Sequence, residues 1–150
     1  MTRWMIQFTL LMASVTLTSA VAADEVEDVK AATENWLSAL NAGDVTALLP
    51  YYHSEETSFG GLGDLLTEGI HTKEFMTAFF ESGFKTDLQW RHMKVKVFGK
   101  AAVVTGYLTG TVTLPGGTVL PDSWRSSVMW VQQEGEWKIV HFHASELLPE

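Results

Sequence analysis

Residues 124–145 read WRSSVMWVQQEGEWKIVHFHAS, and this stretch decides the fold. β-branched and aromatic residues fill both of its halves, while the pair Glu134-Gly135 between them is polar and contains a glycine. Two such runs around a short glycine-containing turn are the pattern of a β-hairpin. We therefore predict a hairpin near the end of the chain and expect the rest of one small domain to be built onto it.

The two-residue period of the hairpin extends upstream. Apolar and polar residues alternate from residue 88 onward, and glycine or proline interrupts the alternation. Such alternation predicts strands with one buried face. We expect four strands in meander order, at residues 88–98, 101–114, 124–133 and 136–146. One short strand is expected before them, at residues 55–59.

Helical spacing precedes these strands. Trp36 and Leu40 belong to a first helix that ends at Gly43. Asp44 is placed to cap a short second helix, and Thr72 to cap a third. Helices followed by an antiparallel meander predict an α+β domain, in which three N-terminal helices pack on a curved, mainly antiparallel sheet.

Residues 1–23 have the composition of a secretory signal peptide. Arg3 precedes an apolar run that ends in small residues, which allow cleavage after Ala22 or Ala23. An uncleaved membrane anchor is the alternative, because the run is nearly long enough to span a bilayer. We expect export to a periplasm or to the outside of the cell, with residues 24–150 as a single domain.

Composition narrows the classes of partner. The chain has no cysteine, so neither a disulfide nor a thiolate ligand is expected. Its formal net charge is −8, and removal of Arg3 with the signal peptide makes it −9. An acidic chain without a basic cluster argues against nucleic acid as a partner, and against a membrane after signal cleavage.

Alternation assigns the strand residues to two faces of the sheet. The apolar set faces the helices and comprises Met93, Val95, Val97, Gly106, Leu108, Gly110, Val112, Ser126, Val128, Trp130, Val140, Phe142 and Ala144. The opposite set is Trp90, His92, Lys94, Lys96, Thr105, Tyr107, Thr109, Thr111, Arg125, Ser127, Met129, His141, His143 and Ser145. Its mixture of aromatic, Met, Arg and Thr residues is typical of a protein–protein interface.

His141 and His143 form a His-x-His pair on the second face, and three interpretations are open: an interface contact, a ligand or catalytic contact, and a metal site. A metal needs a third ligand. In meander order His92 lies three strands away, roughly 14 Å at about 4.8 Å per strand. No carboxylate falls beside the pair on this face. We therefore expect no metal and no cofactor.

An acid–base site has to come from the loops, because the inner face is nearly free of carboxylates. Tyr51, Tyr52 and His53 follow the second helix, and Asp64 and Glu68 lie in the next loop segment. A carboxylate in an apolar cavity has a raised pKa and can act as a general base near neutral pH. A solvated loop is the alternative for each of these residues.

The residues quoted above resemble a known family. WKIVHFHAS after the Glu134-Gly135 turn resembles the C-terminal signature of SnoaL-like proteins of the nuclear transport factor 2-like superfamily. Within this superfamily the chain is most similar to the association (hub) domain of calcium/calmodulin-dependent protein kinase II. The resemblance includes residues 41–44, 63–70 and 115–117, and covers about residues 26–148.

The resemblance implies a cone-shaped α+β fold with a pocket between helices and sheet, and pairing of copies through the outer sheet face. Some members are isomerases, dehydratases or cyclases, and others are binding or oligomerisation modules. Arginines that hold anionic ligands in the kinase hub correspond here to Val128 and Ala144, with a third at Leu108, so anion binding of that kind is not expected.

We expect an exported SnoaL-like domain that binds a small, largely apolar molecule and forms a homodimer or a larger ring. Its expected pocket lining is Trp36, Tyr51, Phe79, Leu108, Ser126, Trp130 and Phe142. Its expected oligomer face is Tyr107, Arg125, His141 and His143. The first alternative is a cofactor-independent isomerase, dehydratase or cyclase that uses Tyr51, His53 or Glu68. The second is a structural hub without a ligand.

Overall fold

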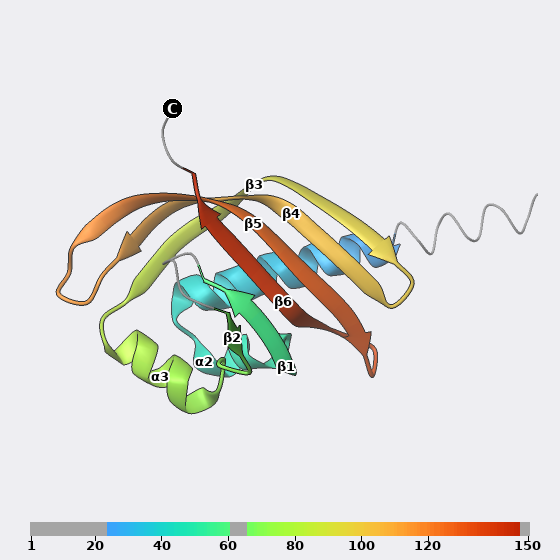
Figure 1. Cartoon of the computed structure of the whole chain (residues 1–150), viewed down its shortest axis with the longest axis horizontal. Helices are drawn as coiled ribbons and strands as arrows, with labels where there is room; N and C mark the ends of the chain where they lie inside the picture. The colour runs from blue at the N-terminus through green and yellow to red at the C-terminus, as the bar shows by residue number, and fades with distance from the viewer. Residues whose placement is uncertain (1–23, 61–65, 148–150) are drawn as a thin grey trace, which may run out of the picture.

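A computed structural model describes residues 24–60 and 66–147 of the chain (Figure 1). The predicted signal peptide and both of its cleavage positions lie outside these residues, and so does Asp64. Within the described ranges, no helix has the length and apolar character needed to cross a membrane.

The sheet has six strands in the order β2-β1-β6-β5-β4-β3. The four long strands follow one another as an antiparallel meander, as predicted, although two of them start earlier than expected. Their bounds are Lys85–Phe98 for β3, Ala101–Thr113 for β4, Val119–Gln133 for β5 and Glu136–Glu146 for β6. The predicted hairpin around Glu134-Gly135 is therefore confirmed as β5–β6.

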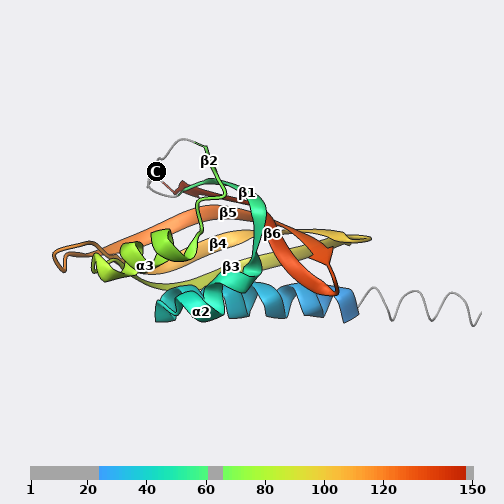
Figure 2. The ribbon, with the colours of Figure 1, turned by 90° about the horizontal axis from the view of Figure 1, so that it is seen from below.

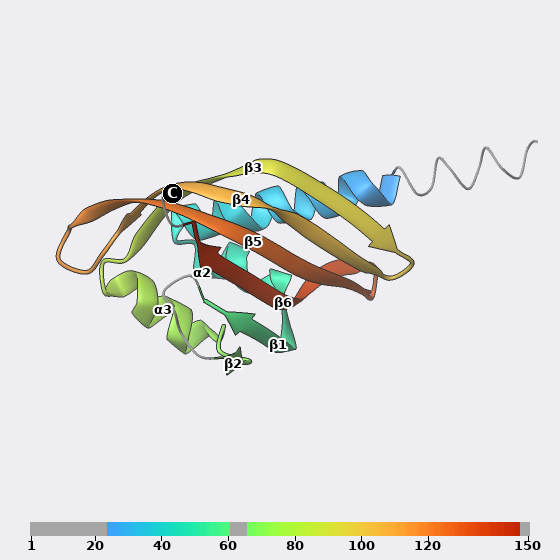
Figure 3. The same cartoon turned by 45° about the horizontal axis from the view of Figure 1, so that its top comes forward.

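Two shorter strands complete the sheet beyond β6. β1 (Tyr52–Phe59) pairs with β6 in parallel, and β2 (Thr67–Glu68) pairs with β1 in antiparallel. Figure 3 shows β1 alongside β6 at this edge of the curved sheet. The parallel pairing was not predicted, because no turn links β1 directly to β6.

The helices cover one side of the sheet. The N-terminal helix is described from residue 24 to residue 42 and lies across the sheet in Figure 2. It is followed by α2 (Val45–Leu48), the 3-10 turn Leu49–Tyr51 and, after β2, α3 (Lys73–Glu81). The predicted α+β class, with three helices packed on a curved and mainly antiparallel sheet, is confirmed.

Local chemistry sets the helix boundaries. Gly43 adopts a φ of 65°, which ends the first helix because the left-handed region favours glycine. The Asp44 side chain accepts a hydrogen bond from the amide of Ala47, and Thr72 accepts one from the amide of Phe75. Both predicted N-caps are thus confirmed.

The core fills the space between the N-terminal helix and the inner face of the sheet. Trp36 is buried and packs against Phe142, with 5.5 Å between the ring centroids. Leu108, Val128 and Trp130 are buried on the central strands. Burial of these large apolar side chains is the main force that holds helix and sheet together.

The outer-face assignment of Trp90 is wrong. Trp90 was expected on the outer face, but it pairs with Leu108 and packs against the core. The cause is an irregularity in β3 between Arg91 and Lys94, where His92 has a φ of 53°. A bulge shifts the alternation by one residue, so positions before it have the opposite parity to those after it.

A second irregularity interrupts the alternation in β6. Ile139 pairs with Trp130 while His141 pairs with the adjacent Met129, so Val140 is the extra residue of a bulge. His141 and His143 then align with Thr57 and Phe59 of β1. The bulge puts buried Ile139 on the helix side without moving the two histidines from the opposite face.

Candidate functional site

A cavity of about 190 Å³ lies between the helices and the inner face of the sheet. The N-terminal helix contributes Trp36, α3 contributes Phe79, and the strands contribute Leu108 and Phe142. These four residues are among the seven expected to line a pocket. Most of the remaining lining is also apolar, and includes Leu88, Met76 and Trp124.

The other three expected lining residues lie elsewhere. Trp130 is completely buried in the core, and Tyr51 packs edge-on against it with 6.3 Å between ring centroids. Tyr51 also borders a separate hollow near Lys138. Ser126 is buried and donates its hydroxyl hydrogen to the backbone oxygen of His143 at 3.1 Å. The cavity is closer to α3 than alternation alone indicated.

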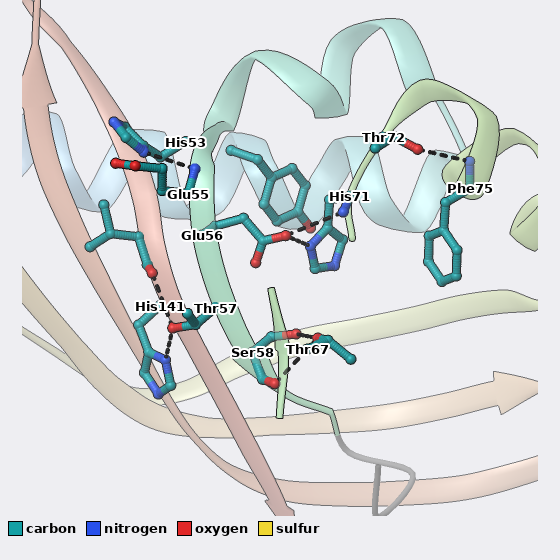
Figure 4. A network of polar contacts seen from close by, with 12 residues as sticks. His53, Glu55, Glu56, Thr57, Ser58, Thr67, His71, Thr72, Phe75 and His141 are labelled. Atoms are coloured by element: carbon teal, nitrogen blue, oxygen red, sulfur yellow. Dashed lines mark hydrogen bonds and ion pairs between the residues drawn. The ribbon is translucent and has the colours of Figure 1, made fainter. Parts of the chain in front are cut away.

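The main polar feature of the cavity wall is a carboxylate–imidazole pair. Oε1 of Glu56 lies 2.7 Å from Nδ1 of His71 and also accepts the backbone N–H of His71 at 3.2 Å (Figure 4). His71 lines the cavity, while Glu56 is only 1% exposed behind it. Oε2 of Glu56 is buried and has no hydrogen-bond partner within the described residues. We call Glu56 and His71 the dyad.

Tyr52 covers one face of the His71 ring. The two rings are stacked, with centroids 4.1 Å apart and planes 2° from parallel. The Tyr52 hydroxyl accepts a hydrogen bond from Nε1 of Trp36 at 3.0 Å. Burial raises the pKa of Tyr52 well above its ordinary value, and the nearby Glu56 carboxylate adds to the rise. The phenol therefore stays neutral near pH 7.

A pair of hydroxyls adds a second polar patch to the wall. Oγ of Ser58 and Oγ1 of Thr67 are 2.7 Å apart, and Thr67 also donates to the backbone oxygen of Ser58 at 3.3 Å. Both residues line the cavity. This contact joins β1 to β2 and leaves only limited hydrogen-bonding capacity for a ligand.

The structure does not bring the three predicted catalytic candidates together. Nδ1 of His53 accepts the backbone N–H of Glu55, and His53 is not part of the cavity wall. Glu68 is exposed on β2, and Tyr51 packs away from the cavity as described above. Of the wider set considered in the loops, Tyr52 lines the cavity.

Glu56 and His71 were missed by sequence reasoning. Glu56 lies within a predicted strand, and alternation with Ser58 was the available signal that it faces inward. That signal does not say which face of β1 is inner, because the parity is set by pairing with β6. His71 directly precedes the Thr72 cap, and nothing in its local sequence indicates a buried carboxylate partner.

The predicted oligomer face is the side of the sheet opposite the helices. Nδ1 of His141 lies 2.8 Å from Oγ1 of Thr57, and Phe59 packs edge-on against both His141 and His143. Arg125 donates to the backbone oxygen of Glu146 at 3.2 Å. Across the described ranges, no three His, Cys, Asp or Glu residues are grouped so that they could hold a metal ion.

Comparison with a family model defines the class of protein. The model of the SnoaL-like domain matches residues 29–149, which is most of the chain. The chain therefore belongs to the SnoaL-like domain family. Among curated proteins, no sequence gives a significant match.

Solved structures agree on the fold. A ketosteroid isomerase-like protein from Erwinia carotovora atroseptica is 22% identical, with a TM-score of 0.70 over 83% of this chain and 98% of that one. The association domain of CaMKII from C. elegans is 24% identical, with a TM-score of 0.67 over 83% of this chain and 98% of that one. An NTF2-like protein from Cytophaga hutchinsonii is 17% identical, with a TM-score of 0.67 over 79% of this chain and 95% of that one. The predicted nuclear transport factor 2-like fold, with similarity to kinase hub domains, is confirmed.

Proposed function

We propose that this protein is an exported SnoaL-like domain that binds a small, largely apolar molecule in the cavity and assembles with copies of itself through the outer sheet face. The observation that carries the ligand proposal is the cavity of about 190 Å³, whose wall is mostly apolar. Binding sites of this character are lined by hydrophobic side chains with few polar groups that orient the ligand.

The size of the cavity limits the ligand. An apolar cavity of about 150 Å³ is large enough to stay dry and bind benzene, whereas sites for drug-sized molecules are roughly 300–1,000 Å³. A compact molecule with one or two small rings suits the space. The ligand carries few polar groups, because each unpaired polar group moved into an apolar wall costs about 1–3 kcal/mol.

The outer face supports the assembly part of the proposal. Tyr107 and Met129 are 39% and 44% exposed, and Phe59 at the neighbouring edge is 43% exposed. Aromatic and Met side chains are enriched at protein–protein interfaces, whereas lysine and glutamate are depleted. A second copy is the natural occupant, since a two-fold axis brings the same patch of each protomer together. A similar structure is itself named an association domain.

The experiment for the ligand proposal is native mass spectrometry of the gently purified protein, before and after addition of naphthalene or benzene. We expect a discrete added mass per subunit, because the cavity stabilises one bound molecule. Leu108→Phe fills the cavity wall and should abolish the added mass. Val112→Leu also enlarges a buried side chain on β4 but lies outside the cavity lining, so it should retain binding.

The same spectra report on the rest of the proposal. Complexes of two or more subunits are expected at micromolar concentration, and the mass of the exported chain gives its N-terminus. A wild-type protein that binds neither compound contradicts the ligand proposal, and a strictly monomeric one contradicts the assembly proposal. An uncleaved chain retained in the cell contradicts export.

A further inference from the structure

The dyad sets the position of the hydrogen on the His71 ring. Oε1 of Glu56 accepts the backbone N–H of His71, so this oxygen acts as an acceptor. When Glu56 is ionised it has no hydrogen to donate, and Nδ1 at 2.7 Å then carries the N–H. In the neutral ring, the second nitrogen Nε2 then has a free lone pair.

His71 is also the residue of the dyad that a bound molecule can reach. Its side chain is 17% exposed and lines the cavity, while the side chain of Glu56 is 2% exposed. Within the described part of the chain, Nε2 makes no hydrogen bond, whereas Nδ1 is held by Glu56. A lone pair at the surface of an apolar cavity is available to a group of the ligand.

Glu56 is in direct contact with the ring that takes up the proton. A buried carboxylate is costly unless it is paired, and Oε2 of Glu56 has no partner within the described residues. When Nε2 accepts a proton, the ring becomes a cation in direct contact with this carboxylate. The desolvated negative charge is then balanced, so Glu56 stabilises the product of proton transfer.

Tyr52 keeps the ring in place without competing for the proton. Its phenol stacks on the imidazole and stays neutral near pH 7. The stacking and the contact from Nδ1 to Glu56 hold the ring in one orientation. A base held in one orientation in a mostly apolar cavity is an arrangement that makes general-base catalysis effective.

We propose that Nε2 of His71 is a general base that removes a weakly acidic proton from the small molecule bound in the cavity, with Glu56 as the positioning residue. This inference rests on the proposed ligand function and deepens it. The proton leaves the ligand for Nε2, its bond electrons stay on the ligand, and the protonated ring returns the proton to another atom of the same molecule. The net reaction is an isomerisation, which requires no co-reactant.

Nitrobenzisoxazole tests this step directly, because it is a compact apolar molecule with one acidic C–H. A base takes that proton, the electron pair forms a nitrile, and the N–O bond breaks to release a coloured phenolate. We expect saturable turnover by the purified protein. His71→Asn should lower kcat about 100-fold or more with KM unchanged, because Asn keeps a donor near Glu56 but lacks Nε2.

Two further variants separate catalysis from structure. His53→Asn is the matched control, since His53 is outside the cavity wall, and it should turn over the probe like the wild type. Glu56→Gln should lower kcat about tenfold or more with little change in KM. The glutamine amide can donate a hydrogen bond to Nδ1, so the His71 ring is no longer held in one tautomer. ¹⁵N NMR of His71 should show the hydrogen on Nδ1 in the wild type and a mixture in Glu56→Gln.

The possible outcomes distinguish this inference from the function on which it rests. Binding of the probe with turnover no faster than free imidazole overturns the general base but leaves the ligand pocket intact. Turnover that His71→Asn leaves unchanged, or a hydrogen found on Nε2 in the wild type, also overturns it. Failure to bind any apolar probe overturns the pocket and the general base together.

Discussion

Tyr52 shows at the residue scale how burial controls the chemistry of the cavity wall. Its hydroxyl accepts a hydrogen bond from Trp36, and its ring lies on His71. Removal from water disfavours the phenolate, which is why the pKa is raised above the ordinary value of about 10. The residue contributes shape and a neutral hydroxyl, while the proposed base function belongs to the imidazole of His71.

The raised pKa of Tyr52 leads to the first prediction. The pKa of Tyr52 is higher in the folded state than in the unfolded state. The contribution of its neutral phenol to the free energy of unfolding is therefore fully present below about pH 10 and is lost as the pH rises beyond that value. Ultraviolet titration of the folded wild type and of Tyr52→Phe should therefore show the same phenolate absorbance up to alkaline unfolding. An additional ionisation in the folded wild type near pH 10 would contradict this expectation.

The dyad is a residue-scale feature whose role in stability is separate from the catalytic role proposed for it. Glu56 joins β1 to the segment before α3 through two contacts to His71. Removing a carboxylate that accepts two hydrogen bonds costs stability whether or not chemistry occurs. The decisive readouts are therefore kcat, KM and the tautomer of His71 rather than the melting temperature.

At the element scale, the sheet curves and changes parity at particular backbone positions. His92 in β3 and Val140 in β6 mark irregularities where the alternation shifts. Gly110 lies in β4 opposite Leu88 and has a φ of 154°. A Cβ at this position would be 2.0 Å from the backbone oxygen of Asp87, so the two strands approach too closely for a side chain.

Gly110→Ala tests this close approach. We expect a loss of about 3 kcal/mol or more in the free energy of unfolding, because the clash is with backbone and the strands must separate. Gly116→Ala is the matched control, since its φ is 97° but a Cβ there meets nothing within 4 Å. The control should lose only about 1–2 kcal/mol from left-handed strain. Equal losses in urea denaturation would show that the approach to Asp87 is unimportant.

At the scale of the whole molecule, the two faces of the sheet differ in what covers them. Helices cover the inner face (Figure 2), and the cavity is lined by residues of both the helices and the sheet. The outer face is left with Tyr107, Met129 and the two histidines beside Phe59. The dyad and the outer face are on opposite sides, so a substitution in one need not disturb the other.

Met129→Lys tests assembly through the outer face. Met129 is 44% exposed at the centre of this face, and a two-fold interface would place the new charges of two copies close together. We expect the dissociation constant measured by analytical ultracentrifugation to rise about tenfold or more. Ser38→Lys adds the same charge on the exposed side of the N-terminal helix and should leave assembly unchanged. Equal assembly of both variants with the wild type would place the interface elsewhere.

The predictability of the site follows from the range of the interactions that build it. Trp36, Phe79, Leu108 and Phe142 were found because each belongs to the apolar side of a local period. Tyr51 and His53 were considered because they follow a helix, but the chain turns them away from the cavity. Trp90 was assigned to the wrong face because a bulge is not visible in the alternation.

The sequence by itself determined the helices, their caps, the four-stranded meander and the terminal hairpin, because hydrophobic period, cap residues and turn glycines act over a few residues. Only the tertiary structure decided that β1 lies parallel to β6, which turns Glu56 inward. It also placed His71, fifteen residues further along, against that carboxylate. Pairing between distant segments depends on how the whole core packs, and so the candidate base and its partner appear only in the folded chain.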